Sequence, residues 1–353
     1  MGVLKAAKVL TLKSARAVGL FNLAGRTAIR RERLLILCYH GISMGQEHAY
    51  SPQMFMPPDV FKRRMQVLKD SGAHVLGLEE ALARLCNDRL PQRSVVLTFD
   101  DGWADFRAAA YPILRRFDFP ATVYLTTYYC LYNRPVFRLA LGYMLWQRRT
   151  EVIENNRLPC LPARLDLRTS AERAAIVSKL DEHAKQHDLS GASKNDLVAA
   201  VAALVGFDYE AFVRERIFQV MSPAEVSEIA QAGIDIQLHS HRHRTPLQRE
   251  RFIGEILENR RHIQELTGNH NCVHYCYPSG AHQSGFLPWL READIQSATT
   301  CISGYSEKAT NRLLLPRLLD DATISETEFE AWVTGFAGLL PKRKQTALAV
   351  APE

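Results

Sequence analysis

Short apolar runs alternate with segments of helical periodicity along most of the chain, from residue 34 onward. Runs of this kind, bounded by turn residues, are typical of buried parallel strands separated by covering helices. The candidate strands are 34–40 (LLILCYH), 94–99 (SVVLTF), 121–127 (ATVYLTT), 234–238 (IDIQL), 272–277 (CVHYCY), 295–301 (IQSATTC) and 312–318 (RLLLPRL). The pattern predicts an α/β fold, a distorted seven-stranded (β/α) barrel with a helical insertion.

The insertion is the one span that breaks the alternation. Between Tyr128 and Met221 the sequence predicts helices near 136–150, 170–187, 194–205 and 209–219, and no strand. Insertions after barrel strands lie on the face that carries catalytic loops, so this span is a lid, a separate helical subdomain or a packed appendage. The expected division is a basic amphipathic segment (1–33), two barrel parts (34–127 and 222–340), the insertion between them (128–221) and a tail (341–353).

Two helices of the second barrel part have clear start signals. Ser222-Pro223-Ala224-Glu225 and Ser325-Glu326-Thr327-Glu328 both match a capping box, and the first has Pro at its first helical position. Gly233 is expected to end the first of these helices just before the strand at 234–238.

Positive charge is concentrated at the N-terminus. The 353 residues carry 44 Lys and Arg against 38 Asp and Glu, a net charge of +6. Residues 1–33 hold eight basic residues and one acidic residue, a net +7, which leaves −1 for the remainder. This segment has one aromatic residue, Phe21, and no recognisable nucleic-acid-binding motif, so it does not indicate nucleic-acid binding.

A helical projection gives this basic segment two faces. At about 100° per residue one arc collects cations and the opposite side collects apolar residues. The cations are Lys5, Lys8, Arg16, Arg26 and Arg30, and the apolar residues are Val3, Leu10, Ala17 and Phe21. The layout predicts peripheral contact with an anionic membrane surface, and a helix packed on the barrel is the alternative, since Leu12 and Leu23 fall among the cations.

The sequence predicts neither export nor membrane insertion. Charges at positions 5, 8, 13 and 16 interrupt any signal-peptide core, and no stretch offers the roughly 18 apolar residues of a spanning helix. The seven cysteines include no CxxC pair, which disfavours a disulfide scaffold. We expect a cytoplasmic protein, peripheral on the inner face of the membrane if the N-terminal helix is interfacial.

Two carboxylates follow the strand at 94–99 directly, in Asp100-Asp101-Gly102. Buried charges must be paired or bound to metal, so adjacent carboxylates at the end of a buried strand point to a cation. The alternative is a turn whose Asp residues cap a helix starting near Trp103.

A histidine cluster, His239-Ser240-His241-Arg242-His243, follows the strand at 234–238. A turn leaving a strand can bring His239 and His243 to one cation, and imidazole is a usual zinc ligand. An alternative takes His239 and His241 as an HxH pair, although that motif normally lies on the first strand of a barrel.

Together these motifs resemble the polysaccharide deacetylase family, also called the NodB homology domain or carbohydrate esterase family 4. The segment 98–102 (TFDDG) matches its first motif letter for letter, and His239, Ser240 and His243 match its second, H-[ST]-x-x-H. The third is met in part by 276–280 (CYPSG), and Tyr39-His40 recurs in one branch of the family. The resemblance spans roughly 34–320, apart from the insertion.

The resemblance implies a division of labour. Asp101, His239 and His243 would bind a divalent metal, most commonly zinc, with positions left open for water and the acetyl oxygen. Asp100 would be the general base, and the backbone N–H of Ser279 would help to hold the oxyanion.

Three departures from the family pattern matter. Cys276 replaces the Arg that pairs with the base in many members, the Asp-Trp of the fourth motif is not recognisable, and the L-x-x-H that supplies the general acid is absent. Arg317 is a candidate partner for Asp100. His40 is our predicted acid, with His282 as the alternative.

The expected function is a metal-dependent hydrolase of the N-acetyl group of an amino sugar, in a polysaccharide or in a lipid- or nucleotide-linked glycan precursor. Amide hydrolysis needs an activated water, a base, an oxyanion site and an acid, and the motifs supply candidates for each. The departures leave open a catalytically silent member that binds sugar or metal, and O-deacetylation is open too.

Overall fold

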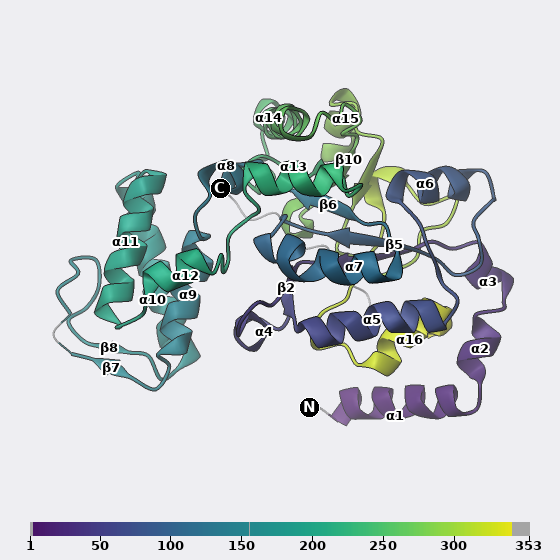
Figure 1. Cartoon of the computed structure of the whole chain (residues 1–353), viewed down its shortest axis with the longest axis horizontal. Coiled ribbons are helices and arrows are strands. Elements are labelled where there is room, and N and C mark those ends of the chain that lie inside the picture. The colour runs from purple at the N-terminus through teal and green to yellow at the C-terminus, as the bar shows by residue number, and fades with distance from the viewer. Residues whose placement is uncertain (1–2, 155, 341–353) are drawn as a thin grey trace.

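Parallel strands form the centre of the molecule in a computed structural model that describes residues 3–154 and 156–340. The main sheet has the order β11-β10-β9-β6-β5-β1-β12, with β4 also paired to β5 (Figure 1). Its strands are β1 (Leu35–Tyr39), β4 (His74–Val75), β5 (Ser94–Phe99), β6 (Thr122–Leu125), β9 (Asp235–Leu238), β10 (His274–Cys276), β11 (Ser297–Thr299) and β12 (Leu318–Leu319). The sheet curls into a half-barrel, which confirms the predicted α/β class.

Helices cover the outside of this sheet, so its central strands are apolar on both faces. All five residues of β1 and all six of β5 are buried, as expected for parallel strands between covering helices and a filled interior. The helices of the barrel are α5 (Pro58–Asp70), α6 (Leu78–Cys86), α7 (Tyr111–Phe117), α13 (Pro223–Gln231), α14 (Arg249–Thr267), α15 (Phe286–Glu292) and α16 (Glu326–Thr334). Shorter elements are β2 (Gly41–Ile42), α4 (Glu47–Tyr50), β3 (Phe55–Met56) and the helical turns η1 (Phe106–Ala110), η2 (Pro278–Gly280), η3 (Arg312–Leu314) and η4 (Phe336–Leu339).

The capping signals have their predicted geometry. Ser222 and Glu225 form a complete capping box at the start of α13, and the Ser325 hydroxyl accepts the Glu328 N–H at the start of α16. Gly233 follows α13 with φ of 90° and leads into β9, as expected.

The predicted seventh strand is wrong over most of its length. Residues 312–314 form η3, which Asn311 caps by accepting the Leu313 N–H, and only Leu318–Leu319 join the sheet as β12. Pro316 interrupts the run because it has no N–H to donate. Leu315 makes an isolated parallel bridge to Thr299, which brings the two ends of the curled sheet together.

The insertion contains the four predicted helices and one short helix before them. They are α8 (Thr127–Tyr132), α9 (Phe137–Gln147), α10 (Ser170–Gln186), α11 (Gly191–Leu204) and α12 (Tyr209–Arg214). The sequence did not predict the two-residue antiparallel strands β7 (Val152–Ile153) and β8 (Leu165–Asp166). Figure 1 shows α9 to α12 as a lobe at one end of the molecule.

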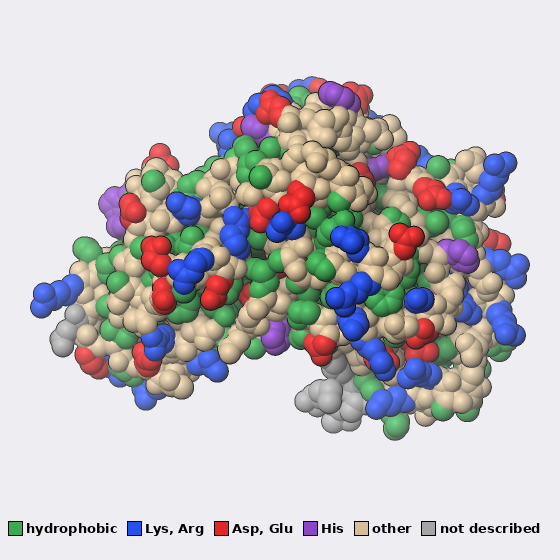
Figure 2. Space-filling view, in the orientation of Figure 1, with side chains coloured by type: hydrophobic (Ala, Val, Ile, Leu, Met, Phe, Trp, Pro, Cys, Tyr) green, Lys and Arg blue, Asp and Glu red, His purple; other side chains and the backbone are tan. Residues whose placement is uncertain are grey.

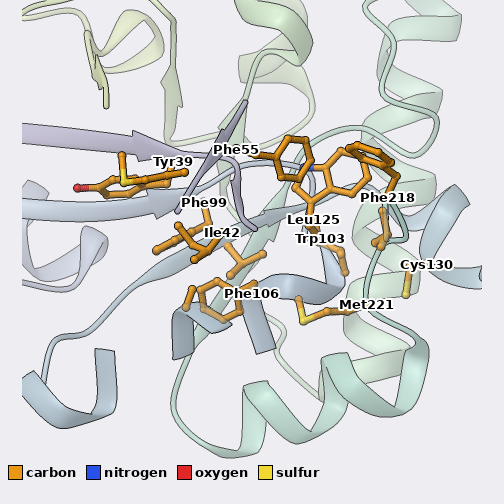
Figure 3. Packing of buried hydrophobic residues seen from close by; sticks show 14 of the residues in the cluster. Tyr39, Ile42, Phe55, Phe99, Trp103, Phe106, Leu125, Cys130, Phe218 and Met221 are labelled. Carbon is orange, nitrogen blue, oxygen red and sulfur yellow. The ribbon is translucent and has the colours of Figure 1, made fainter. Parts of the chain in front are cut away.

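Aromatic residues join this lobe to the barrel. Phe218, from the end of the insertion, lies edge-on to Phe55 at 5.1 Å between ring centroids, and Phe55 packs on Trp103 at 5.8 Å (Figure 3). Phe218 also contacts Tyr143 of α9 at 5.3 Å. The base of the insertion is thus part of the main core.

The prediction of one N-terminal helix with a cationic and an apolar face is wrong. The segment breaks into α1 (Val3–Ala17), α2 (Leu20–Ala24) and α3 (Ala28–Arg31), with Gly19 between the first two at φ of 79°. Phe21 is buried whereas Leu10 is 67% exposed, so they share no face, and Arg30 is buried with its Nε donating to the Val333 carbonyl. The side chains of Val3, Lys5 and Lys8 lie outside the described residues, as does the predicted tail.

The inner face of α1 packs on the barrel, as the alternative interpretation expected. Leu12 and Ala15 are buried together with Phe21 and with Ala331 of α16. Arg16 adds an ion pair to Glu330 at 2.7 Å. Among the described residues no helix is long and apolar enough to cross a membrane.

Candidate active site

The predicted site residues converge at the carboxyl ends of the barrel strands. His40 follows β1, Asp100 and Asp101 follow β5, His239 follows β9, and Ser279 follows β10. Parallel strands of a curled sheet place these ends at one rim, the usual location of catalytic groups in βα barrels.

Asp101 lies between the two predicted histidine ligands. Its Oδ1 is 3.3 Å from His239 Nε2 and 3.2 Å from His243 Nε2. Asp101 and His239 are buried, whereas the His243 side chain is 33% exposed. Although burial opposes ionisation, the charges and hydrogen bonds of His243 and His239 hold the pKa of Asp101 well below its usual range.

These three residues, the ligand triad, offer one carboxylate and two imidazole nitrogens, a set that fits a divalent metal such as zinc. Their ligand atoms lie within 4.8 Å of one another, close enough for one ion to be reached by all three. The triad has three members and an exposed side at His243, whereas a structural metal site is closed by four ligands.

Further contacts orient these ligands. His239 Nδ1 lies 2.9 Å from the Cys276 carbonyl, an acceptor that keeps the proton on Nδ1 and leaves Nε2 free for a metal. The His239 backbone N–H donates to Asn259 Oδ1 at 2.9 Å. Asp101, Ser240 and His243 all have positive φ (68°, 61° and 56°), a strain that folded proteins concentrate at functional sites.

Asp100 points to a different partner, Arg317. The two guanidinium nitrogens of Arg317 donate to the two Asp100 oxygens at 2.7 Å each, and both side chains are almost fully buried. Burial disfavours the carboxylate, but Arg317 overcomes this and lowers the pKa of Asp100 well below its usual range. The Sγ–H groups of Cys38 and Cys276 also donate to Asp100, at 3.5 and 3.4 Å. Arg317 is therefore the partner of Asp100, as the sequence analysis suggested.

His40 is the predicted acid that lies nearest to this pair. Its Nε2 is 4.0 Å from Asp100 Oδ2, and its side chain is 21% exposed. The turn after it is tight: the Ile42 N–H donates to Asp105 at 3.0 Å, and a Cβ on Gly41 would clash with the Phe55 ring. Gly41 is therefore required for the close approach that places His40 at the rim.

Ser279 and His282 both lie after β10 and differ in their contacts. Ser279 is exposed, with φ of 55°. His282 Nδ1 is bound to the Gly280 carbonyl at 2.8 Å, and its ring packs on Tyr277 at 5.5 Å. The described residues thus place His40, and not His282, beside Asp100.

His241 turns away from Asp101, which disfavours the HxH alternative. Its Nδ1 lies 2.8 Å from Thr127 Oγ1, and its Nε2 lies 3.4 Å from Glu258 of α14. It forms a separate group with Glu258 and His262.

Sequence reasoning missed the residues of α14 that hold residues 239–243, the histidine loop. Asn259 binds the His239 N–H and also donates to the Leu125 carbonyl at 3.0 Å. Glu255 accepts the Arg242 N–H at 2.7 Å. Both are polar residues buried on a helix, and nothing in the apolar pattern of the sequence marks them as buried.

Comparison with known proteins agrees with this geometry. A family profile described as polysaccharide deacetylase matches residues 87–143 and 182–298, and the gap between the two matches falls in the insertion. YxkH of Bacillus subtilis, which carries the name putative polysaccharide deacetylase, is 35% identical over 94 residues, 26% of this chain. The match spans 32% of the length of that relative, about a third.

Solved structures share the fold. The deacetylase PplD of Streptococcus pyogenes, in complex with acetate, has a TM-score of 0.54 and 21% identity, over 84% of this chain and 96% of its own. IcaB from Ammonifex degensii has a TM-score of 0.54 and 15% identity, over 86% and 97% of the two chains.

Proposed function

Because the chain belongs to the polysaccharide deacetylase family, we propose that it is a metal-dependent deacetylase that hydrolyses the N-acetyl group of an amino sugar in a glycan. The observation that carries this proposal is the convergence of Asp101, His239 and His243 beside a second carboxylate, Asp100. Acetate release from acetylated sugars, lost on chelation and restored by zinc, tests it.

The residues of this chain divide the chemistry between them. Asp101, His239 and His243 would hold a divalent cation, most commonly zinc, which would acidify water and polarise the acetyl carbonyl. Asp100, kept ionised by Arg317, takes the proton of the attacking water. The Ser279 N–H stabilises the oxyanion, and His40 gives a proton to the leaving amine.

The Arg317 contact supports turnover over a silent, sugar-binding role. The missing third-motif Arg and the missing acid are the sequence arguments for silence, and Arg317, just before β12, supplies a bidentate partner to Asp100. O-deacetylation uses the same groups, and it is distinguished by whether acetate release leaves a free amine or a free hydroxyl.

We also propose a reducing, cytoplasmic location. The seven cysteines all lie in the described part of the chain, and all are free thiols. Two of them, Cys38 and Cys276, donate to Asp100 as thiols, so their oxidation would remove contacts of the catalytic carboxylate.

The outer face of the N-terminal helices supports peripheral contact with an anionic membrane. Leu10, Val18 and Leu23 are 67%, 72% and 64% exposed, and the exposed cations Lys13 and Arg26 lie in the same segment. Figure 2 shows Lys and Arg side chains gathered along the lower right of the molecule, where α1 to α3 lie in Figure 1.

This membrane contact is tested by sedimentation with vesicles. Each basic residue near an anionic leaflet contributes about 1 kcal/mol, and salt screens this attraction. We expect binding to anionic but not neutral vesicles, release by salt, and loss of binding when Leu10, Val18 and Leu23 are replaced by Ser. Equal binding to both vesicle types would contradict the proposal.

A further inference from the structure

A cleft lined by four tyrosines, the tyrosine cleft, lies within the insertion. Tyr128, Tyr129 and Tyr132 contribute to it from α8, and Tyr209 from α12. The cleft opens to solvent, and its empty volume of about 400 Å³ includes part of that solvent. It is separate from the ligand triad and has no part in the chemistry described above.

The tyrosine rings are held in fixed positions. Tyr128 and Tyr132 stack at 6.1 Å with an interplanar angle of 18°, and Tyr129 lies edge-on to Tyr128 at 5.2 Å. The Tyr132 hydroxyl donates to the Gly191 carbonyl, and the Tyr209 hydroxyl donates to Asn195 at 2.6 Å. Fixed rings lose little conformational entropy when a ligand binds.

The chemistry of the cleft suits a sugar ring. A pyranose presents C–H groups on its faces and hydroxyls around its rim, and half-buried tyrosines offer both an apolar face and a hydrogen-bonding group. The hydroxyls of Tyr128 and Tyr129 bind no other residue in the described part of the chain, so they are free to bind a ligand.

Two basic residues stand beside the tyrosines. Arg134 and Lys194 line the cleft. Burial raises the pKa of Tyr209 to about 12 against the opposing charge of Arg134, so its hydroxyl is uncharged at neutral pH.

The cleft adjoins the histidine loop, which carries two of the metal ligands. The Tyr128 ring lies edge-on to His241 at 5.9 Å, and the Tyr128 N–H donates to the His241 carbonyl at 2.8 Å.

We propose that the tyrosine cleft is a subsite for a neighbouring sugar of the acetylated chain. The substrate is then a glycan of several sugars, and not a single nucleotide-linked amino sugar. This inference rests on the proposed deacetylase function, because the cleft would hold one sugar while another is deacetylated.

Chain-length dependence tests the subsite. Acetate release is measured for N-acetylglucosamine and for its tetramer with wild type, Tyr132→Ala and Tyr209→Ala. Wild type should prefer the tetramer, and each variant should raise KM for the tetramer about tenfold while kcat/KM for the single sugar stays within about twofold. Tyr132→Phe keeps the ring and should keep the preference, and Tyr111→Ala, a half-buried tyrosine of α7 outside the cleft, is the matched control.

Binding without turnover separates this inference from the proposed function. Saturation-transfer NMR of the metal-free protein with the tetramer should give a signal that Tyr132→Ala abolishes and Tyr132→Phe retains. If wild type releases no acetate yet binds the tetramer in this way, the deacetylase function fails and the subsite stands. If wild type shows no preference for the tetramer, or if the tyrosine variants weaken single-sugar and tetramer hydrolysis equally, the subsite is overturned.

Discussion

Replacement of Arg317 by Met should destabilise the protein, because it leaves a buried carboxylate without its partner. Arg317 and Asp100 have side-chain exposures of 0% and 3%, and two hydrogen bonds of 2.7 Å join them. Removing one partner of a buried ion pair typically costs about 3–5 kcal/mol. Arg317 also donates to the Thr300 carbonyl and the Thr98 hydroxyl, at 3.1 Å each. We therefore expect Arg317→Met to lower the free energy of unfolding by about 4 kcal/mol, measured by urea denaturation at pH 7.

The pair should also show strong coupling. Asn at position 100 removes the unpaired charge, so Asp100→Asn combined with Arg317→Met should recover about half of the loss, or about 2 kcal/mol. Arg317→Lys keeps the charge but cannot donate to both oxygens in the same way, so its stability should be intermediate.

The pH dependence has a definite sign. In wild type the lowered pKa of Asp100 gives stability that is present above the unfolded pKa of about 4 and is lost as pH falls through the folded value. In Arg317→Met the lowering by Arg317 is lost, so burial, the largest influence, raises the pKa of Asp100 and stability is lost as pH rises. The difference between wild type and variant should therefore widen between about pH 4 and pH 8. A loss below about 1 kcal/mol, or simple additivity in the double variant, would refute the reasoning.

Three further predictions concern metal content, the acid and the second buried pair. Asp101→Asn and His243→Ala should lose bound zinc, whereas Asp100→Asn and His241→Ala should keep it, as measured by elemental analysis. The assignment would be contradicted if Asp100→Asn lost as much metal as Asp101→Asn, or if His241→Ala lost its metal. His40→Ala should move or remove the alkaline limb of the pH profile of kcat/KM, and His282→Ala should not, because His40 lies beside Asp100. An unaltered alkaline limb in His40→Ala would mean that His40 is a structural residue. Burial raises the pKa of Asp320 to about 6 despite its partner Arg64. Wild type should therefore lose stability relative to Asp320→Asn as pH rises from about 4 to about 6, with no further change above that range. Parallel curves of unfolding free energy against pH for the two proteins would contradict this.

The convergence of Asp101, His239 and His243 could be predicted from the sequence because strand ends are easy to locate and because the motifs around them resemble those of a known family. Two apolar strands end directly in Asp100-Asp101 and in His239, and parallel strands bring their ends to one rim. The partner of Asp100 was harder to place. Arg317 lies just before β12, in a run that the apolar pattern assigned to a longer strand, so only the fold shows that its guanidinium points at Asp100.

Other features depended on contacts that a one-dimensional pattern does not contain. The projection of residues 1–33 assumed one continuous helix, but Gly19 breaks it, and contact with α16 determines which residues are buried. Asn259 and Glu255 have polar side chains on a helix, and their burial follows from the histidine loop packing against α14. The tyrosine cleft likewise forms only because α8 and α12, at opposite ends of the insertion, meet in space.

The central claim is tested most directly by mass spectrometry of acetylated amino-sugar oligomers incubated with the zinc-loaded protein. The account predicts loss of an acetyl group with gain of a free amine, abolished in Asp101→Asn and by chelation. Unchanged oligomers at full zinc occupancy, or acetate release that persists in Asp101→Asn, would contradict it.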